Sequence, residues 1–197
     1  MIIDPTILTV SGKEVSILNP DPGTIDIKDI AHALSHINRF TGHTAVPYTV
    51  AEHSLRVSSY LKAQGYTPAS QLAGLLHDAS EAYLGDVSTP LKQLLPDYKQ
   101  IELNFERVIE LRFGVVFIDR PEVKAADIQL LSTECRALMP RCARDWPIIK
   151  GLDPDNYGNA VKTNTQWGNR SRDELIGWFL KRYNQLNKEI VNAHPQY

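Results

Sequence analysis

Apolar residues recur at helical spacing along most of the chain. The pattern predicts helices over residues 26–37, from Thr49 onward, and over 68–84, 97–113, 121–139 and 172–190, with a short segment at 90–95. Near the start, residues 7–18 alternate moderately around Ser11-Gly12, which indicates two short strands joined by a turn. We therefore expect an all-α fold, with a short β-hairpin at its N-terminal end.

Polar residues at the predicted ends support these boundaries. Thr49 with Glu52, and Ser171 with Glu174, have the spacing of capping boxes. Asp97 is the expected N-cap of its helix, and Gly114 the expected stop. Residues 140–168, between the last two predicted helices, are rich in Pro, Gly, Asn and Asp, and we expect this stretch to be irregular. The predicted buried faces include Ile101, Phe105, Val108, Leu111, Leu175, Trp178 and Phe179.

Composition narrows the class of protein. With 197 residues, 43% hydrophobic and 22% charged, the chain suits one globular domain spanning residues 1–197. The formal net charge of −2, without a long basic block, disfavours a duplex nucleic-acid binder. No apolar run approaches the length of a membrane span and no signal peptide is evident, so we expect a cytoplasmic protein. Cys135 and Cys142 are expected to be reduced core residues.

The stretch from Gln71 to Lys92 carries the most unusual chemistry. An apolar helix is interrupted by His77-Asp78, and Glu81 follows one turn later, so three ionisable groups share one sector. Buried charges must be paired or bound to metal, or else reach solvent. The plain alternative is a helix end that emerges into water.

Two other helices add ionisable groups. His53 lies in the first turns of the helix from Thr49, and Asp127 lies within an apolar run, where an unpaired aspartate is unusual. The partner of Asp127 is either a metal or an arginine, Arg120 or Arg56. A separate pair, His32 and His36, has i, i+4 spacing that can chelate a metal, but no third ligand is obvious apart from His43, and packing or surface roles are the simpler interpretation.

The order His53, His77-Asp78, Asp127 resembles the H…HD…D pattern of the HD-domain superfamily of metal-dependent phosphohydrolases. The segment HDASEAYLGDVSTPLK (77–92) resembles small bacterial 5′-deoxynucleotidases and phage enzymes that hydrolyse dATP. The segment RFTGHTAVPYTVAEHS (39–54) resembles the phage-type members especially. The resemblance covers residues 39–127, about half of the chain, and implies an HD-type helical bundle.

The resemblance also implies roles for individual residues. The implied metal ligands are His53, His77, Asp78 and Asp127. Two imidazoles and two carboxylates suit Co, Mn, Zn, Fe or Ni, and Mg²⁺ would accompany the substrate phosphates.

Residues around the ligands match the substrate and catalytic groups of the family. Glu81 is the candidate for orienting or deprotonating the attacking water, and Asp86 for positioning a second water or the sugar. Arg39 matches the phosphate-binding arginine, and Lys92 is a second candidate cation. Phe40 replaces the tryptophan usual in the bacterial monophosphatases, and His43, Lys92 and Lys150 could provide charge for further phosphates.

Several functions remain open at this stage. The first is hydrolysis of dATP to deoxyadenosine and triphosphate, and the second is a 5′-deoxynucleotidase acting on monophosphates. A nucleotide-binding sensor with a structural metal, and a cyclic-nucleotide or RNA phosphodiesterase, are alternatives from other classes. The resemblance further implies a homo-oligomer, either a dimer or a hexamer.

Overall fold

The computed structural model describes residues 4–161, 167–168 and 170–193, with the side chains of residues 159–161 excepted. It is mostly helical, with one two-stranded antiparallel sheet in the described part. The elements are β1 (Thr6–Leu8), β2 (Glu14–Ser16), α1 (Ile27–His36), η1 (Arg39–Gly42), α2 (Val50–Ala63), α3 (Pro68–Leu76), α4 (Glu81–Leu84), α5 (Thr89–Lys92), α6 (Pro96–Phe113), α7 (Pro121–Leu138), η2 (Arg141–Asp145), η3 (Pro147–Ile149), α8 (Asn156–Val161) and α9 (Arg172–Ala193). The predicted helical class and the N-terminal hairpin are confirmed, and within the described residues no helix is apolar and long enough to cross a bilayer.

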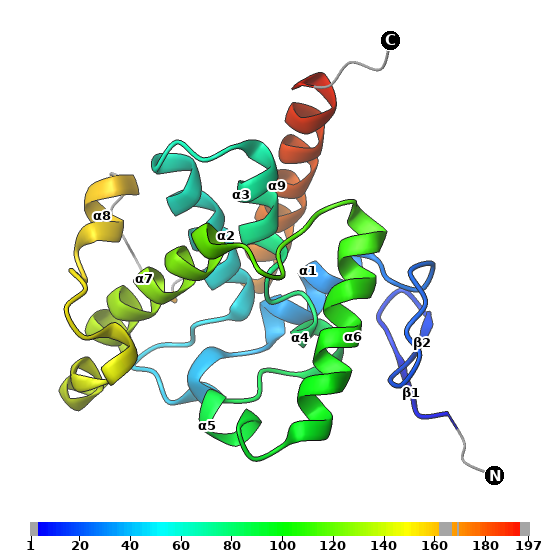
Figure 1. Ribbon diagram of the computed structural model, residues 1–197, viewed down its shortest axis with the longest axis horizontal. Coiled ribbons are helices and arrows are strands. Elements are labelled where there is room, and N and C mark those ends of the chain that lie inside the picture. Colours follow the sequence, from blue (N-terminus) through cyan, green and yellow to red (C-terminus); the bar gives the residue numbers. More distant parts are fainter. Residues whose placement is uncertain (1–3, 162–166, 169, 194–197) are drawn as a thin grey trace.

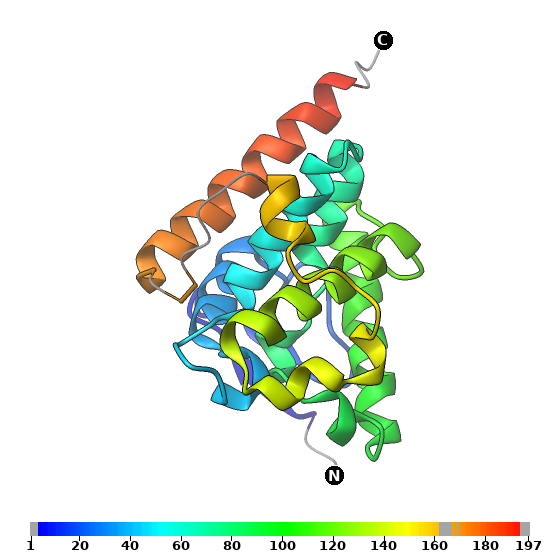
Figure 2. The same ribbon diagram turned by 90° about the vertical axis from the view of Figure 1, so that its left-hand side faces the viewer.

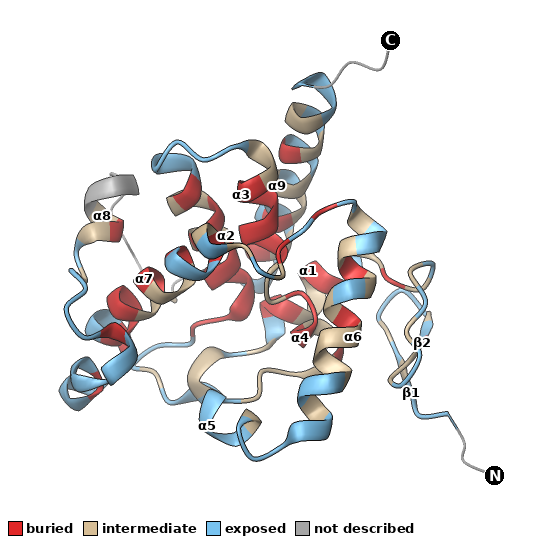
Figure 3. Cartoon of the chain, in the orientation of Figure 1, coloured by how far each residue is buried: buried red, intermediate tan, exposed pale blue. Residues whose placement is uncertain are grey.

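Helix α2 lies at the centre of the bundle. It packs against α1, α3, α7 and α9, and α9 runs along α1 and α3 before its C-terminal end extends past the other helices (Figures 1 and 2). Figure 3 shows that the buried residues concentrate on α1–α4 and on the inner face of α7. The arrangement brings α7, which is distant in sequence, against the consecutive helices α2 and α3.

The ends of the helices follow the predicted capping signals in part. The Thr49 hydroxyl accepts a hydrogen bond from the Glu52 backbone N–H, and Ser171 and Glu174 form a reciprocal capping box. Gly114 ends α6 with a left-handed conformation, as predicted. Asp97 is not the N-cap, however, because α6 begins one residue earlier at Pro96, which suits the first turn of a helix.

The structure corrects several other predictions. The single helix expected over residues 68–84 is broken: α3 ends at Leu76, and α4 begins only at Glu81. The expected irregular stretch, residues 140–168, contains η2, η3 and α8, while residues 162–166 lie outside the described part.

Three residues assigned to the core are exposed. Leu111 is 74% exposed and Trp178 is 41% exposed, because each lies on the outer side of its helix. Both cysteines are free thiols, as expected, but only Cys135 is buried; Cys142 is exposed because α7 ends before it and η2 turns it outward.

Candidate metal centre

Three ionisable side chains from three elements meet between α2, α3 and α7. His53 comes from α2, His77 from the turn directly after α3, and Asp127 from α7. One candidate ligand atom from each lies within 4.8 Å of the others, so the cluster could hold a metal ion. The break after Leu76 contributes to this geometry, because His77 is the residue at which α3 ends.

Both imidazoles are oriented through their Nδ1 atoms. The Nδ1 of His53 lies 2.6 Å from Oε1 of the fully buried Glu134, and the Nδ1 of His77 lies 2.9 Å from the carbonyl oxygen of Gly74. Because both partners are acceptors, each Nδ1 carries the proton. The two Nε2 atoms then face one another at 3.3 Å. Holding a ligand imidazole through its second nitrogen is the usual arrangement at metal sites.

Two carboxylates complete the cluster. Oδ1 of Asp127 lies 3.3 Å from Nε2 of His53 and 4.0 Å from Nε2 of His77. Asp78 lies beside both rings, with its oxygens 3.3 Å from Nε2 of His77 and 3.6 Å from Nε2 of His53. The Asp78 carboxylate therefore lies beside both imidazoles, but it is not part of the three-residue group whose ligand atoms all come within 4.8 Å of one another.

Arg39 and Glu134 lie directly behind these residues. Arg39 places one guanidinium nitrogen 3.3 Å from Asp78 and another 3.3 Å from Glu134, while the Tyr48 hydroxyl donates to Glu134 over 2.8 Å. The three carboxylates Asp78, Asp127 and Glu134 outnumber the two cations that pair with them, Arg39 and Lys124, which leaves one negative charge if the imidazoles are neutral. A cation held between the imidazoles would offset that charge.

The pKa shifts of His53, Asp127 and Glu134 also show that the site favours positive charge beside ionised carboxylates. Burial and the charge of Arg39 lower the pKa of His53, but Glu134 and Asp127 outweigh them and raise it to about 9. Burial raises the pKa of Asp127, yet the hydrogen bond with His53 and the charge of His77 hold it well below its usual range. Burial likewise works against ionisation of Glu134, and the charges of Arg39 and His53 lower its pKa to about 2. The site therefore stabilises anionic carboxylates and a cation between them.

The residues fit a divalent transition metal. Imidazole nitrogens and carboxylate oxygens are borderline-to-hard ligands that suit Mn, Fe, Co, Ni or Zn. Within the described residues, the group of His53, His77 and Asp127 is the one whose spacing suits an ion, and the His32–His36 pair gains no third ligand. Instead, the two rings stack at 4.3 Å and Nδ1 of His36 bonds to the carbonyl of His32.

Glu81 and Asp86, which follow the His77-Asp78 pair, interact electrostatically with Asp78. Glu81 is buried, and its Oε2 atom has no hydrogen-bond partner in the described structure. Burial, followed by the charges of Asp78 and Asp86, raises the pKa of Glu81 well above its usual range; burial also raises the pKa of Asp86. Lys92 pairs with Glu102 and lies 3.9 Å from Glu81.

The loop before α2 carries the predicted substrate residues. Arg39 is largely buried and engaged with Asp78 and Glu134, whereas His43 is exposed. Phe40 and Thr41 both have left-handed backbone conformations, with φ of 56° and 54°, which cost energy for residues other than glycine. Phe40 lies against Trp146, with ring centroids 6.4 Å apart. The segment Arg39–Gly42 (η1) therefore forms a strained turn beside the cluster.

A cleft of about 600 Å³ opens beside the metal centre. It is lined by His77, Asp78, Glu106, Phe117, Ile118, Asp119, Arg120, Pro121, Val123, Lys124 and Asp127. Burial, followed by the charge of Glu102, raises the pKa of Glu106 to about 7. The volume is within the range of small-molecule sites.

Sequence reasoning missed two groups at this site. Glu134 lies two helical turns after Asp127 on the same face of α7, in a buried stretch, and that spacing was the available signal. Lys124 lies three residues before Asp127, and that i, i+3 spacing was a signal too, whereas Glu106 gave none, because only the fold brings α6 to the cleft. The arginine alternatives for Asp127 were wrong: Arg120 pairs with Glu122 and Arg56 with Glu52, while Asp127 pairs with Lys124 over 2.8 Å.

The fold and the cluster together define a helical protein with a candidate site for one divalent metal. No model of a known protein family matches the chain. The chain is 35% identical over 182 residues to the uncharacterized protein YfdR of Escherichia coli (strain K12), an alignment that covers 92% of this chain and 96% of that protein. It therefore belongs to the same family as YfdR. It is also similar to the uncharacterized protein RCAP_rcc00048 of Rhodobacter capsulatus, with 38% identity over 122 residues, 59% of this chain and 62% of that protein.

Proposed function

We propose that the chain is a metal-dependent phosphohydrolase of the HD type, and that it hydrolyses dATP to deoxyadenosine and triphosphate. The observation that carries this proposal is the pair of imidazoles whose Nε2 atoms face one another at 3.3 Å, with Asp127 and Asp78 beside them, at the edge of a cleft. A site of this kind needs a cation, and the cleft beside it gives a nucleotide access.

In this proposal, His53, His77 and Asp127 hold the ion, and Asp78 is the fourth ligand. A divalent metal bound there would polarise a phosphoryl oxygen and lower the pKa of a water molecule. Glu134 and the Gly74 carbonyl keep the two imidazoles in the required tautomer. Arg39 keeps Asp78 in place from behind, over 3.3 Å.

Glu81 is the proposed general base. Its buried carboxylate has an oxygen without a hydrogen-bond partner among the described residues, and burial with the charges of Asp78 and Asp86 raises its pKa, which makes it a stronger base. Lys92, 3.9 Å away, and Asp86 set the charge around it. The water oxygen forms a bond to the α-phosphorus, the bond from that phosphorus to the 5′ oxygen of the sugar breaks, and a proton returns to the 5′ oxygen.

The cleft supplies places for the rest of the nucleotide. Lys124 and Arg120 are cations on its wall, paired with Asp127 and Glu122, and each would exchange that partner for the β- or γ-phosphate. Phe117 and Ile118 offer apolar surface to the base. Lys150, one of the predicted phosphate cations, lines a different cavity and takes no part here. The cytoplasmic setting, the adenine preference and an oligomer, either a dimer or a hexamer, belong to this proposal.

A 5′-deoxynucleotidase is the second candidate. It is favoured by the engagement of two of the predicted phosphate cations with carboxylates, Arg39 with Asp78 and Glu134, and Lys92 with Glu102. A substrate with a single phosphate needs fewer free cations than a triphosphate. The same metal centre would serve both reactions.

Product analysis distinguishes the two. The protein, loaded separately with Co, Mn, Zn, Fe or Ni, is incubated with dATP, dAMP or a cyclic nucleotide, and the products are separated by chromatography. Deoxyadenosine with intact triphosphate from dATP supports the first candidate, and deoxyadenosine with phosphate from dAMP alone supports the second. Cleavage of the cyclic nucleotide alone would assign a phosphodiesterase, and no turnover of any substrate would support a sensor.

Two histidine variants make the test specific to the site. His77→Ala should abolish turnover, whereas His36→Ala, which removes an imidazole from the stacked surface pair, should retain it. Equal activity of the two variants would contradict the proposed metal centre.

A further inference from the structure

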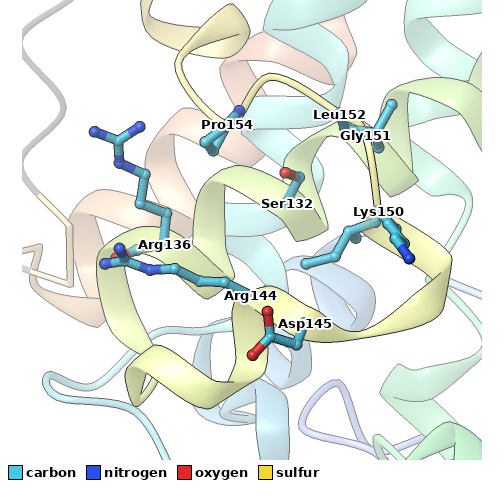
Figure 4. A pocket seen from close by; sticks show the side chains of 9 residues that line it. Ser132, Arg136, Arg144, Asp145, Lys150, Gly151, Leu152 and Pro154 are labelled. Carbon is cyan, nitrogen blue, oxygen red and sulfur yellow. The ribbon is translucent and has the colours of Figure 1, made fainter.

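A second cavity lies on the other side of α7 from the metal centre. It measures about 310 Å³, is open to solvent, and is bordered by α7, η2, η3 and the chain that follows (Figure 4). It is lined by Ser132, Arg136, Arg144, Asp145, Ile149, Lys150, Gly151, Leu152 and Pro154. None of these residues lines the cleft at the metal centre.

The periodicity of α7 separates the two sites. Ser132 and Arg136 follow Asp127 by five and nine residues, which places them roughly 140° and 180° around the helix from it. Glu134, seven residues after Asp127, returns to the face that contacts His53. One helix thus presents carboxylates to the metal centre and a hydroxyl and a guanidinium to the second cavity.

The cavity is basic in a protein that is acidic as a whole. Arg136, Arg144 and Lys150 line it against the single carboxylate of Asp145, although the chain has a formal net charge of −2. Arg136 pairs with Asp155 over 2.8 Å, and Arg144 donates to the Arg136 carbonyl. Elsewhere in the described structure, no carboxylate lies within ion-pair distance of Arg144 or Lys150.

The remaining wall is mixed in character. Ser132 is buried, and its hydroxyl makes no hydrogen bond with the described residues, so it is available to a ligand. Ile149, Leu152 and Pro154 supply apolar surface. In Figure 4, Arg136 and Arg144 lie to one side of Ser132 and Lys150 to the other, with their charged ends directed outward. A phosphate bound over Ser132 would therefore have to draw these long, exposed side chains in from both sides.

We propose that this cavity binds a small phosphorylated molecule. A phosphate group carries enough charge to engage Arg144 and Lys150 together and accepts hydrogen bonds from the Ser132 hydroxyl, while the apolar wall contacts the body of the ligand. The volume lies at the lower end of small-molecule sites, so the ligand is no larger than a nucleoside monophosphate. This site is independent of the reaction proposed for the metal centre.

Calorimetric titration of the full chain after metal removal tests the proposal. Pyrophosphate is the probe for phosphate alone, dAMP for a phosphate joined to a nucleoside, and citrate for carboxylates of similar charge. We expect pyrophosphate and dAMP to bind, and citrate to bind at least about 10-fold more weakly. If dAMP binds more tightly than pyrophosphate, its nucleoside contacts the apolar wall at Leu152. Citrate binding as tightly as pyrophosphate would overturn the assignment to phosphate.

Matched variants locate the site. Arg144→Ala and Lys150→Ala should each weaken pyrophosphate binding about 10-fold, whereas Arg107→Ala, which removes the same charge from the exposed surface of α6, should leave it unchanged. His77→Ala should also leave it unchanged, since the metal centre is elsewhere. Unaltered binding in both cavity variants, or loss in His77→Ala, would overturn the site, whether or not the protein hydrolyses dATP.

Discussion

The two faces of α7 stabilise charge in opposite ways. On the inner face, Asp127 and Glu134 are removed from most or all solvent, and each is matched by a specific imidazole or guanidinium at a distance of 2.6–3.3 Å. On the outer face, Arg136 and the neighbouring Arg144 of η2 are exposed and make few contacts. Buried charges depend on every partner, because desolvation must be offset by geometry. Exposed charged side chains make weak, solvent-screened contacts and can change conformation, so the outer face can adapt to a ligand while the inner face cannot.

The largest expected effect comes from the inner face. Asp127→Asn keeps the size of the side chain but removes the anionic charge next to His53 and His77. We expect turnover to fall by about 10³-fold or more and the metal to be lost on dialysis, because the carboxylate is both a ligand and a counter-charge. Metal analysis together with initial rates checks this. The surface aspartate Asp145, replaced by Asn, is the control and should change neither.

Glu134→Gln tests the residues behind the ligands. The amide cannot balance the charge of Arg39 or hold His53 as strongly, so metal affinity should fall about 10- to 100-fold. Loss of one partner of a buried ion pair should also reduce the free energy of unfolding by about 3 kcal/mol. Competitive metal titration and denaturation in EDTA measure the two effects.

Tyr48→Phe provides the graded control for Glu134. It removes one neutral hydrogen bond to the same carboxylate and leaves the charge in place, so unfolding should cost only about 1 kcal/mol less. An effect of Tyr48→Phe as large as that of Glu134→Gln would show that the charge of Glu134 is not what matters.

Glu106 gives a pH-dependent effect of intermediate size. Since burial and Glu102 raise its pKa to about 7, the folded state resists its ionisation, and the resulting loss of stability is absent below about pH 4.5, grows as the pH rises, and is complete above pH 7. Glu106→Gln should therefore stabilise the metal-free protein at pH 8 by about 1–2 kcal/mol, after allowance for partial exposure, and have almost no effect at pH 4.5. Denaturant unfolding at both pH values tests this, with the exposed Glu14→Gln as a control that should show no such difference.

The smallest effect is expected on the outer face. Arg144→Ala should change the free energy of unfolding by less than about 0.5 kcal/mol and leave metal affinity unaltered, because Arg144 is exposed and contacts only a carbonyl. A loss of metal affinity in this variant would show that the two faces of α7 are coupled.

Local signals predicted what depends on neighbouring residues. The helical class, the N-terminal hairpin and the caps at Thr49 and Ser171 follow from spacing and short-range hydrogen bonds. The meeting of His53, His77 and Asp127 was predicted through a resemblance in their order along the chain. The roles assigned to Glu81, Asp86 and the substrate residues remain predictions.

Features that depend on packing could not be predicted in this way. The break between Leu76 and Glu81 occurs in a stretch whose apolar spacing favours a continuous helix. Only the tertiary structure shows that this turn places His77 and Asp78 beside His53. The exposure of Trp178 depends on which face α9 turns to α1 and α3. Likewise, the engagement of Arg39 with Glu134 joins residues far apart in sequence.

Gly74 links the packing of two helices to the position of a candidate ligand. A Cβ atom there would lie 2.5 Å from Leu61 Cδ1 and 3.0 Å from Val57 Cγ1, so the bare residue lets α3 approach α2 closely, and its carbonyl also orients His77. A larger residue at position 74 would push α3 away from α2 and move His77 relative to His53. The contact between two helices at a residue without a side chain therefore sets the spacing of the two imidazoles.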